Sequence, residues 1–212
     1  MMYMANPTKG TLEPMLEGKL GYINTPAQGN RMPEGVWWCA DNSCFGTTYP
    51  GDEKWFAWLG KLAPRQDMCF FATAPDIVGD AAGTLERSRP WLEKIRDLGY
   101  KAALVGQDGL ENLTVPWDEF DAFFVGGSTE WKLSQAASGL ATEARDRGKH
   151  THLGRVNSRK RVMFAKAAIP ATDSHPGGYD TVDGTYLVFG PDINLPKLLR
   201  WMNEVNNELA LI

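Results

Sequence analysis

The hydrophobic positions of this chain fall into short continuous runs that alternate with longer segments of helical spacing. Eight runs are rich in β-branched or aromatic residues and bounded by Gly, Pro, Asp or Asn, which is typical of strands buried on both faces. These predicted strands are 20–23, 35–40, 68–72, 101–105, 122–125, 150–153, 179–182 and 186–189. Continuous apolar runs of this kind favour parallel strands covered by helices.

Four segments between these runs repeat their apolar residues every three or four positions, as one face of a helix does. The predicted helices are 52–62, a segment through 92–98 with a start capped by Ser88 and Pro90 near that start, 133–144 and 194–209. Pro is tolerated in the first turn of a helix, where its missing N–H would have no partner. The last segment has the most regular apolar spacing of the four.

Strands that alternate with helices predict a parallel α/β architecture. About eight strands with interleaved helices fit a compact (β/α)₈ TIM-type barrel, for which roughly 200 residues is the lower size limit. An open, doubly wound sheet is the alternative, and both folds place functional groups beyond the carboxyl ends of the strands. No Gly-, Ser- or Pro-rich linker and no internal repeat divides the chain, so we expect one domain over residues 1–212.

The composition describes a globular chain that is long enough for one sizeable core. Hydrophobic residues make up 43% of the 212 positions and charged residues 23%, which excludes disorder. The formal net charge of −4 means that a nucleic-acid partner would need a local basic patch. We find no apolar run of the roughly 20 residues that a membrane helix needs, and no signal peptide, so a cytoplasmic protein without a membrane partner is expected.

Two carboxylates follow the third predicted strand. Asp76 and Asp80 stand four residues apart beside Pro75 and Gly79. Neighbouring acids at a strand end suit acid–base chemistry, because burial or like charge separates their pKa values. Each can also serve the fold alone, and Asp80 in particular is placed to cap the next helix.

Polar and glycine-rich segments follow the next two strands. Gln107 lies between glycines, where its amide can bind a planar ligand such as a nucleobase edge or simply form a polar turn. Gly126 and Gly127 allow a ligand to approach the backbone, although glycines also serve merely to turn a chain. Ser128 and Lys132 continue this segment as candidate substrate contacts, and Ser128 can alternatively cap a helix.

The sixth predicted strand leads into the only strongly basic stretch of the chain. Arg155, Asn157, Arg159, Lys160 and Arg161 lie there, close to a predicted helix start. Such a cluster is a candidate phosphate cradle for a nucleic-acid backbone. A solvated helix face explains the last three residues equally well.

The histidines and cysteines do not form a metal-site pattern. His150 and His152 alternate along one strand and cannot easily face one metal together, so they are interpreted as core or surface residues. Cys39, Cys44 and Cys69 include no CxxC pair, and an odd number argues against a disulfide framework. We therefore expect neither a metal nor a cofactor, for which no glycine-rich nucleotide motif is present.

Asp183 and Gly184 allow two interpretations. At the carboxyl end of a barrel strand, Asp183 could act as a nucleophile or a base. An Asp-Gly pair between apolar runs is also a common signal for a type I′ hairpin turn. The residues alone leave both open.

Taken in order, these strand-end motifs resemble the tRNA-guanine transglycosylase superfamily, and most closely its phage-associated branch that inserts 7-deazaguanines into DNA. The resemblance covers about 21–191. It rests on Cys39-Ala40-Asp41-Asn42, Pro75-Asp76-Ile77-Val78-Gly79-Asp80, Gly106-Gln107-Asp108-Gly109, Val125-Gly126-Gly127, His152-Leu153-Gly154-Arg155-Val156-Asn157-Ser158 and Asp180-Thr181-Val182-Asp183-Gly184-Thr185.

The resemblance implies a (β/α)₈ barrel that breaks an N-glycosidic bond and forms it again with another base. Asp183 would be the nucleophile at C1′, and Asp76 would recognise the base and manage its protons. Gln107 and the backbone at Gly126 and Gly127 would bind the purine-like ring. DNA and a free 7-deazaguanine base would be the partners, with a helper protein as a further candidate, in the host cytoplasm if a phage encodes the chain.

This chain departs from the family pattern in two respects, which concern the substrate and the nucleophile. The C-terminal zinc motif of the tRNA-modifying members is absent, which disfavours tRNA as the substrate. Residues 169–178 resemble an insertion before the nucleophile strand, which makes Asp173 and Asp180 alternatives to Asp183. A barrel N-glycoside hydrolase and a non-catalytic nucleic-acid-binding barrel are the competing functions.

Overall fold

The structure is a computed structural model, and it describes residues 1–29 and 31–207. Eight parallel strands follow one another around a closed barrel in chain order. The first strand pairs with the second on one side and with the eighth on the other, which closes the sheet. The predicted compact (β/α)₈ barrel is therefore confirmed, and the open doubly wound alternative is excluded.

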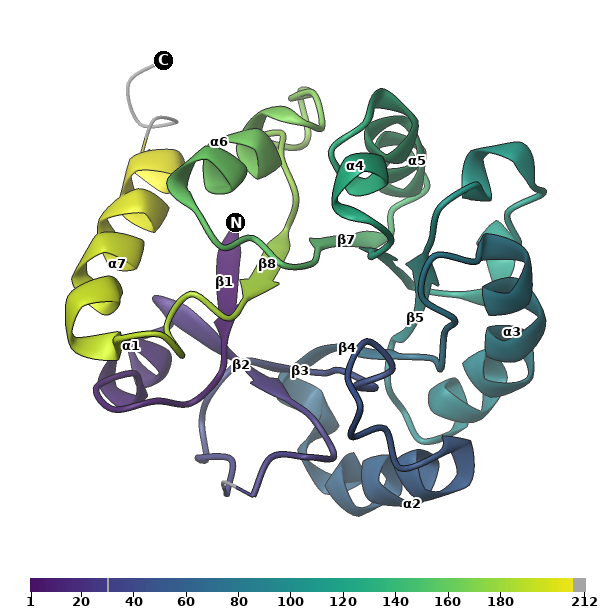
Figure 1. The fold of residues 1–212 in the computed structure, drawn as a ribbon, viewed down its shortest axis with the longest axis horizontal. Coiled ribbons are helices and arrows are strands. Elements are labelled where there is room, and N and C mark those ends of the chain that lie inside the picture. Colours follow the sequence, from purple (N-terminus) through teal and green to yellow (C-terminus); the bar gives the residue numbers. More distant parts are fainter. Residues whose placement is uncertain (30, 208–212) are drawn as a thin grey trace.

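The strands are β1 (Met2–Ala5), β2 (Leu20–Asn24), β3 (Trp38–Ala40), β4 (Cys69–Thr73), β5 (Ala102–Gly106), β6 (Ala122–Val125), β7 (His150–Leu153) and β8 (Thr181–Gly184). The α-helices are α1 (Leu12–Leu16), α2 (Asp52–Leu62), α3 (Ala81–Asp97), α4 (Thr129–Lys132), α5 (Gln135–Asp146), α6 (Arg159–Ala167) and α7 (Pro191–Asn207). Three 3₁₀ segments, η1 (Ala63–Met68), η2 (Leu110–Asn112) and η3 (Trp117–Glu119), complete the elements. The helices form a ring outside the strands (Figure 1).

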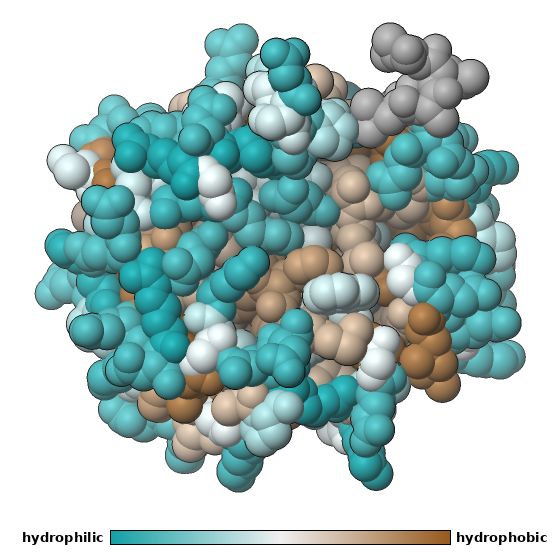
Figure 2. Space-filling model, turned by 180° about the vertical axis from the view of Figure 1, so that it is seen from behind, coloured by the Kyte–Doolittle hydropathy of each residue, from teal (hydrophilic) through white to brown (hydrophobic). Residues whose placement is uncertain are grey.

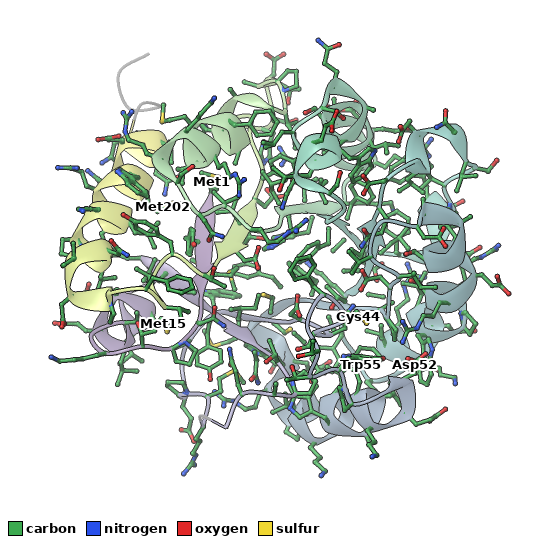
Figure 3. The ribbon with its side chains drawn as sticks, in the orientation of Figure 1. Met1, Met15, Cys44, Asp52, Trp55 and Met202 are labelled. Atoms are coloured by element: carbon green, nitrogen blue, oxygen red, sulfur yellow. The ribbon has the colours of Figure 1, made fainter. Side chains whose placement is uncertain are left out.

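Side chains of the strands alternate between the barrel interior and the helices, as the twofold repeat of a strand requires. The interior is filled by an apolar cluster of Met4, Ile23, Cys39, Phe71, Ala103, Val105, Ala122 and Phe124. A larger cluster packs the outer faces of the strands against the helices, with Met15 of α1, Trp55 of α2 and Met202 of α7 among its members (Figure 3). The barrel is a packed core at this level, so a ligand can enter only at an end.

One end of the barrel is closed by apolar and aromatic residues. Trp37 stacks on Phe70 with ring centroids 5.1 Å apart, and Phe70 stacks on His150 at 5.3 Å. Phe70 and His150 lie at the amino-terminal ends of β4 and β7, and Trp37 directly precedes β3. The face behind that of Figure 1 is hydrophilic around its rim, with hydrophobic side chains gathered near its centre (Figure 2).

Two strand predictions are wrong at the ends of the chain. Residues 186–189 form no strand, and β8 occupies Thr181–Gly184 instead of 179–182. The missing eighth strand is β1, whose Met-rich sequence of four residues lacks both β-branched residues and a preceding turn signal. The predicted number of strands was right only because the false strand at 186–189 compensated for the overlooked β1.

The Asp183–Gly184 hairpin is likewise excluded. Both residues belong to β8, which pairs in parallel with β1 and β7. Gly184 is required here because of crowding: a Cβ would collide with Asn157 Oδ1 and would lie 2.9 Å from the carbonyl oxygen of Val156. The pair therefore reflects close packing at a strand end instead of a turn.

Helix starts differ from two of the predictions. Asp80 caps α3 by accepting the Gly83 N–H at 2.9 Å, so the helix begins at Ala81 and Ser88 lies inside it. The predicted helix 133–144 is preceded by the short α4, and α5 starts after a Ser134 cap. For α7, the predicted end at 209 lies outside the described residues. Local cap chemistry decided these boundaries more strongly than the apolar spacing did.

None of the helices within residues 1–29 and 31–207 has the length and apolar character that a membrane span requires.

Candidate functional site

A cavity of about 430 Å³ opens at the carboxyl ends of the strands. This volume falls within the usual range for small-molecule sites. Residues from all eight strand ends and the loops that follow them line it: Asn6, Ile23, Thr25, Ala27, Asp41, Asn42, Ser43, Phe45, Gly46, Thr48, Asp76, Val78, Val105, Gln107, Phe124, Gly126, Gly127, Gly154, Arg155, Asn157, Asp183, Gly184 and Thr185. Seven predicted site residues are in this wall: Asp76, Gln107, Gly126, Gly127, Arg155, Asn157 and Asp183.

Asp76 is held in the cavity wall by two amide side chains. Asn42 Nδ2 donates to Asp76 Oδ1 at 2.8 Å and to the carbonyl of Ala74 at 2.7 Å. Gln107 Nε2 donates to Asp76 Oδ2 at 2.6 Å. Burial raises the pKa of Asp76, and the hydrogen bonds from Asn42, Cys44 and Gln107 oppose that rise. The carboxyl group is thereby fixed in position while lone pairs remain for a ligand.

Gln107 links three loops at the mouth of the barrel. Its Oε1 accepts the N–H of Gly79 at 2.9 Å and the N–H of Gly127 at 3.0 Å. Both predicted ligand contacts, the Gln107 carbonyl and the Gly127 amide, are thus already used within the fold. One N–H of the Gln107 amide group remains, so its main effect is to position Asp76 and the glycine turn.

Gly126 and Gly127 shape the wall beside Gln107. A Cβ on Gly126 would lie 2.8 Å from Val105 Cγ1 and 3.1 Å from Gln107 Nε2. Gly127 has a φ of +64°, which disfavours other residues. The Gly127 carbonyl accepts a hydrogen bond from the Arg155 guanidinium. The paired glycines therefore let this turn pack closely against its protein neighbours, and both of them line the cavity.

Asp183 enters the cavity from β8 between two groups of the neighbouring β7 segment. Its Oδ1 accepts the backbone N–H of Arg155 at 2.6 Å, and His152 Nε2 lies 3.5 Å from the same oxygen. Within the described residues, Asp183 Oδ2 has no hydrogen-bond partner. The geometry therefore leaves one carboxylate oxygen available to a ligand.

Asp41 is a site residue that sequence reasoning did not select. It follows β3 directly, lines the cavity and accepts the Ser43 N–H at 2.7 Å. Burial and the nearby charge of Asp183 raise the pKa of Asp41 to about 7. The signal in the sequence was its position directly after a buried strand, which it shares with the candidates of the later strands.

Three predicted substrate contacts lie outside the cavity wall. Asp80 caps α3, and the Ser128 side chain caps α4 by accepting the Trp131 N–H at 3.1 Å. Lys132 is buried, and its Nζ donates to the Gly154 carbonyl at 2.9 Å. Burial, reinforced by the positive charge of Arg155, lowers the pKa of Lys132 to about 7. These side chains support the loops that form the site.

The basic segment divides into two parts. Arg155 adopts a φ of +60°, and its guanidinium lies 4.3 Å from the centre of the exposed Phe45 ring. Asn157 Oδ1 accepts the Thr185 N–H at 2.7 Å. On α6, Arg159 pairs with Glu204 at 2.9 Å, Lys160 is exposed, and Arg161 Nη1 donates to the Arg155 carbonyl at 2.9 Å.

The basic residues therefore run from the cavity wall, at Arg155 and Asn157, to the first turn of α6 outside it. Arg161 links the two parts, because its Nη1 donates to the Arg155 carbonyl. The charges on α6 do not line the cavity themselves.

The two alternative nucleophiles lie elsewhere. Asp180, just before β8, accepts the Thr151 backbone N–H at 2.7 Å and pairs with Arg145 at 3.4 Å. Asp173 is exposed on the loop between α6 and β8. Of these three aspartates, Asp183 alone lines the cavity. His150 and His152 are on the same face of β7, as residues two apart on a strand are, and both rings contact Thr181, so the expectation that they point apart is wrong. Within 1–29 and 31–207, no group of three His, Cys, Asp or Glu side chains could hold a metal ion.

Comparison with known proteins identifies distant structural similarity only. No known protein family matches the chain, and no curated protein matches it. A solved structure, the carboxyl transferase domain of Rhizobium etli pyruvate carboxylase with 3-hydroxypyruvate, is similar at a TM-score of 0.44 and 15% sequence identity. The similar region covers 82% of this chain but 35% of that one, so the chain spans about a third of the length of this neighbour.

Proposed function

We propose that the protein is a base-exchange enzyme that replaces guanine in DNA with a 7-deazaguanine through a covalent intermediate on Asp183. The observation that carries the proposal is that Asp183 and Asp76 line one cavity, the first with a free Oδ2 and the second held by two amides. A retaining exchange needs this pair: a nucleophile for the sugar and an acceptor group for the base.

Asp76 is suited to recognise the Watson–Crick edge of guanine. That edge presents an N–H and an amino group, both of which donate hydrogen bonds, and a carboxylate offers about four acceptor sites. Asn42 and Gln107 occupy two of these sites and hold the carboxyl group in a fixed orientation. Gly126 and Gly127 line the adjacent wall of the same cavity, where the base would lie.

The exchange then proceeds in two balanced steps. Asp183 Oδ2 forms a bond to C1′ while the C1′–N9 bond breaks, and the electron pair of that bond leaves on guanine, which takes up a proton. The 7-deazaguanine next loses its N9 proton, and N9 attacks C1′. The C1′–O bond breaks and its electron pair returns to the Asp183 carboxylate. Charge and atoms are restored at the end of each cycle.

Asp41 is the best candidate for the proton that these two steps exchange. A general acid or base works best when its pKa lies near the operating pH. The pKa of Asp41 is raised to about 7 by burial and by Asp183. The same carboxyl group would protonate the leaving guanine and deprotonate the incoming base. Asp76, whose pKa is also raised by burial, would chiefly recognise the base.

DNA would have to deliver the target base into the cavity by flipping it out of the helix. Arg155 and Asn157 in the wall, followed by Arg159, Lys160 and Arg161 towards α6, are placed to bind phosphates of the flanking backbone. Phe45 is exposed at the same rim and could support an unstacked base.

Incorporation of isotopically labelled guanine into DNA tests the exchange without knowledge of the natural base. We expect the wild-type protein to place label in DNA, Asp183→Asn to place none, and Asp173→Asn, an exposed aspartate outside the cavity, to match the wild type. Release of unlabelled guanine without incorporation would contradict exchange and favour a hydrolase. Binding of DNA with neither reaction would contradict an enzymatic function altogether.

A further inference from the structure

A line of polar side chains crosses the apolar interior of the barrel directly below Asp183. His150 and His152 of β7 and Thr181 of β8 form it. The Thr181 hydroxyl oxygen lies 2.8 Å from His150 Nε2 and 2.8 Å from His152 Nδ1. His152 Nε2 in turn lies 3.5 Å from Asp183 Oδ1.

His152 has no other polar contact on its Nε2 side. Its side chain is fully buried, and Nε2 lacks a hydrogen-bond partner within the described residues. The ring lies 4.3 Å from the Phe124 ring and 5.1 Å from the Phe71 ring, measured between centroids. A buried polar atom without a partner is costly, so the Asp183 oxygen is the group that this nitrogen can use.

The single hydroxyl hydrogen of Thr181 limits the protonation of both histidines. It can be donated to one imidazole nitrogen, and the other nitrogen must then donate its own hydrogen to the hydroxyl oxygen. If His152 Nδ1 carried the hydrogen of a neutral ring, the bare lone pair of Nε2 would face a carboxylate oxygen. The opposite arrangement avoids this repulsion: Thr181 donates to His152 Nδ1, and the His152 Nε2–H points towards Asp183.

We propose that His152, held by Thr181 as the neutral Nε2–H tautomer, is a positioning residue that fixes Asp183 Oδ1 so that Oδ2 faces the sugar; this rests on the proposed role of Asp183. The Arg155 N–H, 2.6 Å from Oδ1, is the second group that holds the same oxygen. Two donors on one carboxylate oxygen leave the other free to react. Thr181 and His150 act through His152 and touch no substrate.

The His152 ring is buried beside two aromatic rings, the Thr181 hydroxyl and the Asp183 carboxylate. Burial lowers the pKa of His150 to about 4, so the histidine on the far side of Thr181 is uncharged and carries one N–H. On β8, Asp183 is the charged group beside His152, while β4 and β6 present the rings of Phe71 and Phe124. Arg155, which follows β7, donates its backbone N–H to Asp183.

The tautomer can be measured without any catalytic assay. Long-range nitrogen–proton correlation spectra at neutral pH distinguish the two neutral imidazole tautomers and the imidazolium. His150→Asn and His175→Asn variants assign the signals, since the chain has three histidines. We expect the His152 signals of the Nε2–H tautomer in the wild-type protein. The Nδ1–H tautomer or an imidazolium would overturn the assignment.

Variants of Thr181 test the positioning role. Thr181→Val removes the hydroxyl with little change of shape, and we expect kcat to fall by up to about 100-fold with KM for DNA and base unchanged. Thr181→Ser should restore kcat. The control is Thr151→Val: Thr151 is equally buried on β7, but its hydroxyl bonds to Arg145 and Asp180 instead of the His152 ring, so kcat should be retained.

The two readouts separate the failure of this inference from the failure of the proposed function. Suppose that the wild type shows no exchange, but that His152 is the Nε2–H tautomer and shows a mixture of tautomers in Thr181→Val. The hydrogen bonds from Thr181 to His152 would then be supported, and the proposed reaction would be contradicted. If the wild type is active and Thr181→Val is equally active, the positioning role is overturned.

Discussion

The backbone N–H of Arg155 donates to Asp183 Oδ1 over 2.6 Å, and this bond joins the ends of β7 and β8 at the cavity. Arg155 can present its N–H in this direction because its φ is +60°. Such a conformation is uncommon for a residue with a Cβ and is often found where a site imposes it. The guanidinium of the same residue contacts Gly127 and Phe45. Arg155 therefore serves the site through its backbone and its side chain separately.

Replacing Arg155 by glycine or by alanine separates these two roles. Both variants lose the guanidinium, so both should bind DNA more weakly. Because glycine adopts positive φ without strain, Arg155→Gly should be more stable than Arg155→Ala by about 1 kcal/mol. Urea unfolding of the pair measures this difference. Equal stability would show that the left-handed conformation at this position imposes no strain.

Gln107 is predicted to matter more for stability and base binding than for the chemical step. Gln107→Leu leaves the N–H groups of Gly79 and Gly127 without an acceptor and removes one donor from Asp76. Gly127 is buried, whereas Gly79 is exposed, so its N–H can bind water instead. Since a buried unpaired group costs about 1 to 3 kcal/mol, we expect a loss of about 2 kcal/mol in unfolding free energy. KM for the base should also rise.

Gln107→Glu is the matched control for that variant. It keeps the acceptor for both glycine N–H groups but places a second carboxyl group beside Asp76. We therefore expect it to be better folded than Gln107→Leu at acidic pH and to lose that advantage as the pH rises. If Gln107→Leu unfolds at the wild-type urea concentration, the loop-linking role of Gln107 is wrong.

Asp41 should give exchange a pH dependence near neutrality. If the protonated Asp41 assists departure of guanine, kcat falls as the pH rises through about 7, where its raised pKa lies. Asp41→Asn should lower kcat by roughly 100-fold or more and remove this descending limb. A pH–rate profile of the wild type and the variant tests this. An unchanged limb in Asp41→Asn would assign the titration to another group.

The same carboxyl group links stability to pH with a defined sign. The pKa of Asp41 is higher in the folded protein than the ordinary value of 3.8, so the folded state retains a proton that the unfolded state has lost between these pH values. Its contribution to stability is therefore lost as the pH rises from about 4 to about 7. Asp41→Asn should be more stable than the wild type above neutrality, by up to about 4 kcal/mol, and no more stable near pH 3.

The basic turn of α6 is predicted to supply part of the affinity for DNA. Lys160→Ala should weaken binding and reduce the slope of log affinity against log salt by about one. Arg159 is already paired with Glu204, so Glu204→Gln should free its charge and strengthen binding. Lys61→Ala, an exposed lysine on α2, is the control. Equal effects at Lys160 and Lys61 would show that the α6 turn is not a DNA contact.

The barrel was predictable from the sequence because its middle strands are buried on both faces. The predicted run 101–105 is apolar from 102 onward and 122–125 is apolar throughout, and they coincide closely with β5 and β6. The strands at the two ends of the chain were harder to predict. β1 is identified by its pairing with β8, a contact between opposite ends of the chain that no local pattern contains.

The site was predictable as a set of strand-end residues but not as a network. Asp76, Gln107 and Asp183 were found because each follows or ends a buried strand. The sequence could not show that the Gln107 side-chain carbonyl accepts the N–H groups of two glycines, because these glycines lie on loops that only the fold brings together. The raised pKa of Asp41 arises from burial beside Asp183, which lies far away in sequence. The local sequence therefore indicated which residues belong to the site, and the tertiary contacts determined what each of them does.

Base exchange in DNA is the central claim, and it has one direct test. The protein is incubated with DNA and 7-cyano-7-deazaguanine, with and without cell extract to supply a helper protein, and the DNA is digested and analysed by mass spectrometry. We predict the modified deoxynucleoside with the wild-type protein and none with Asp183→Asn, which retains an acceptor for the Arg155 N–H and should remain folded. Unmodified DNA in the presence of the extract, or full modification by Asp183→Asn, would contradict the account.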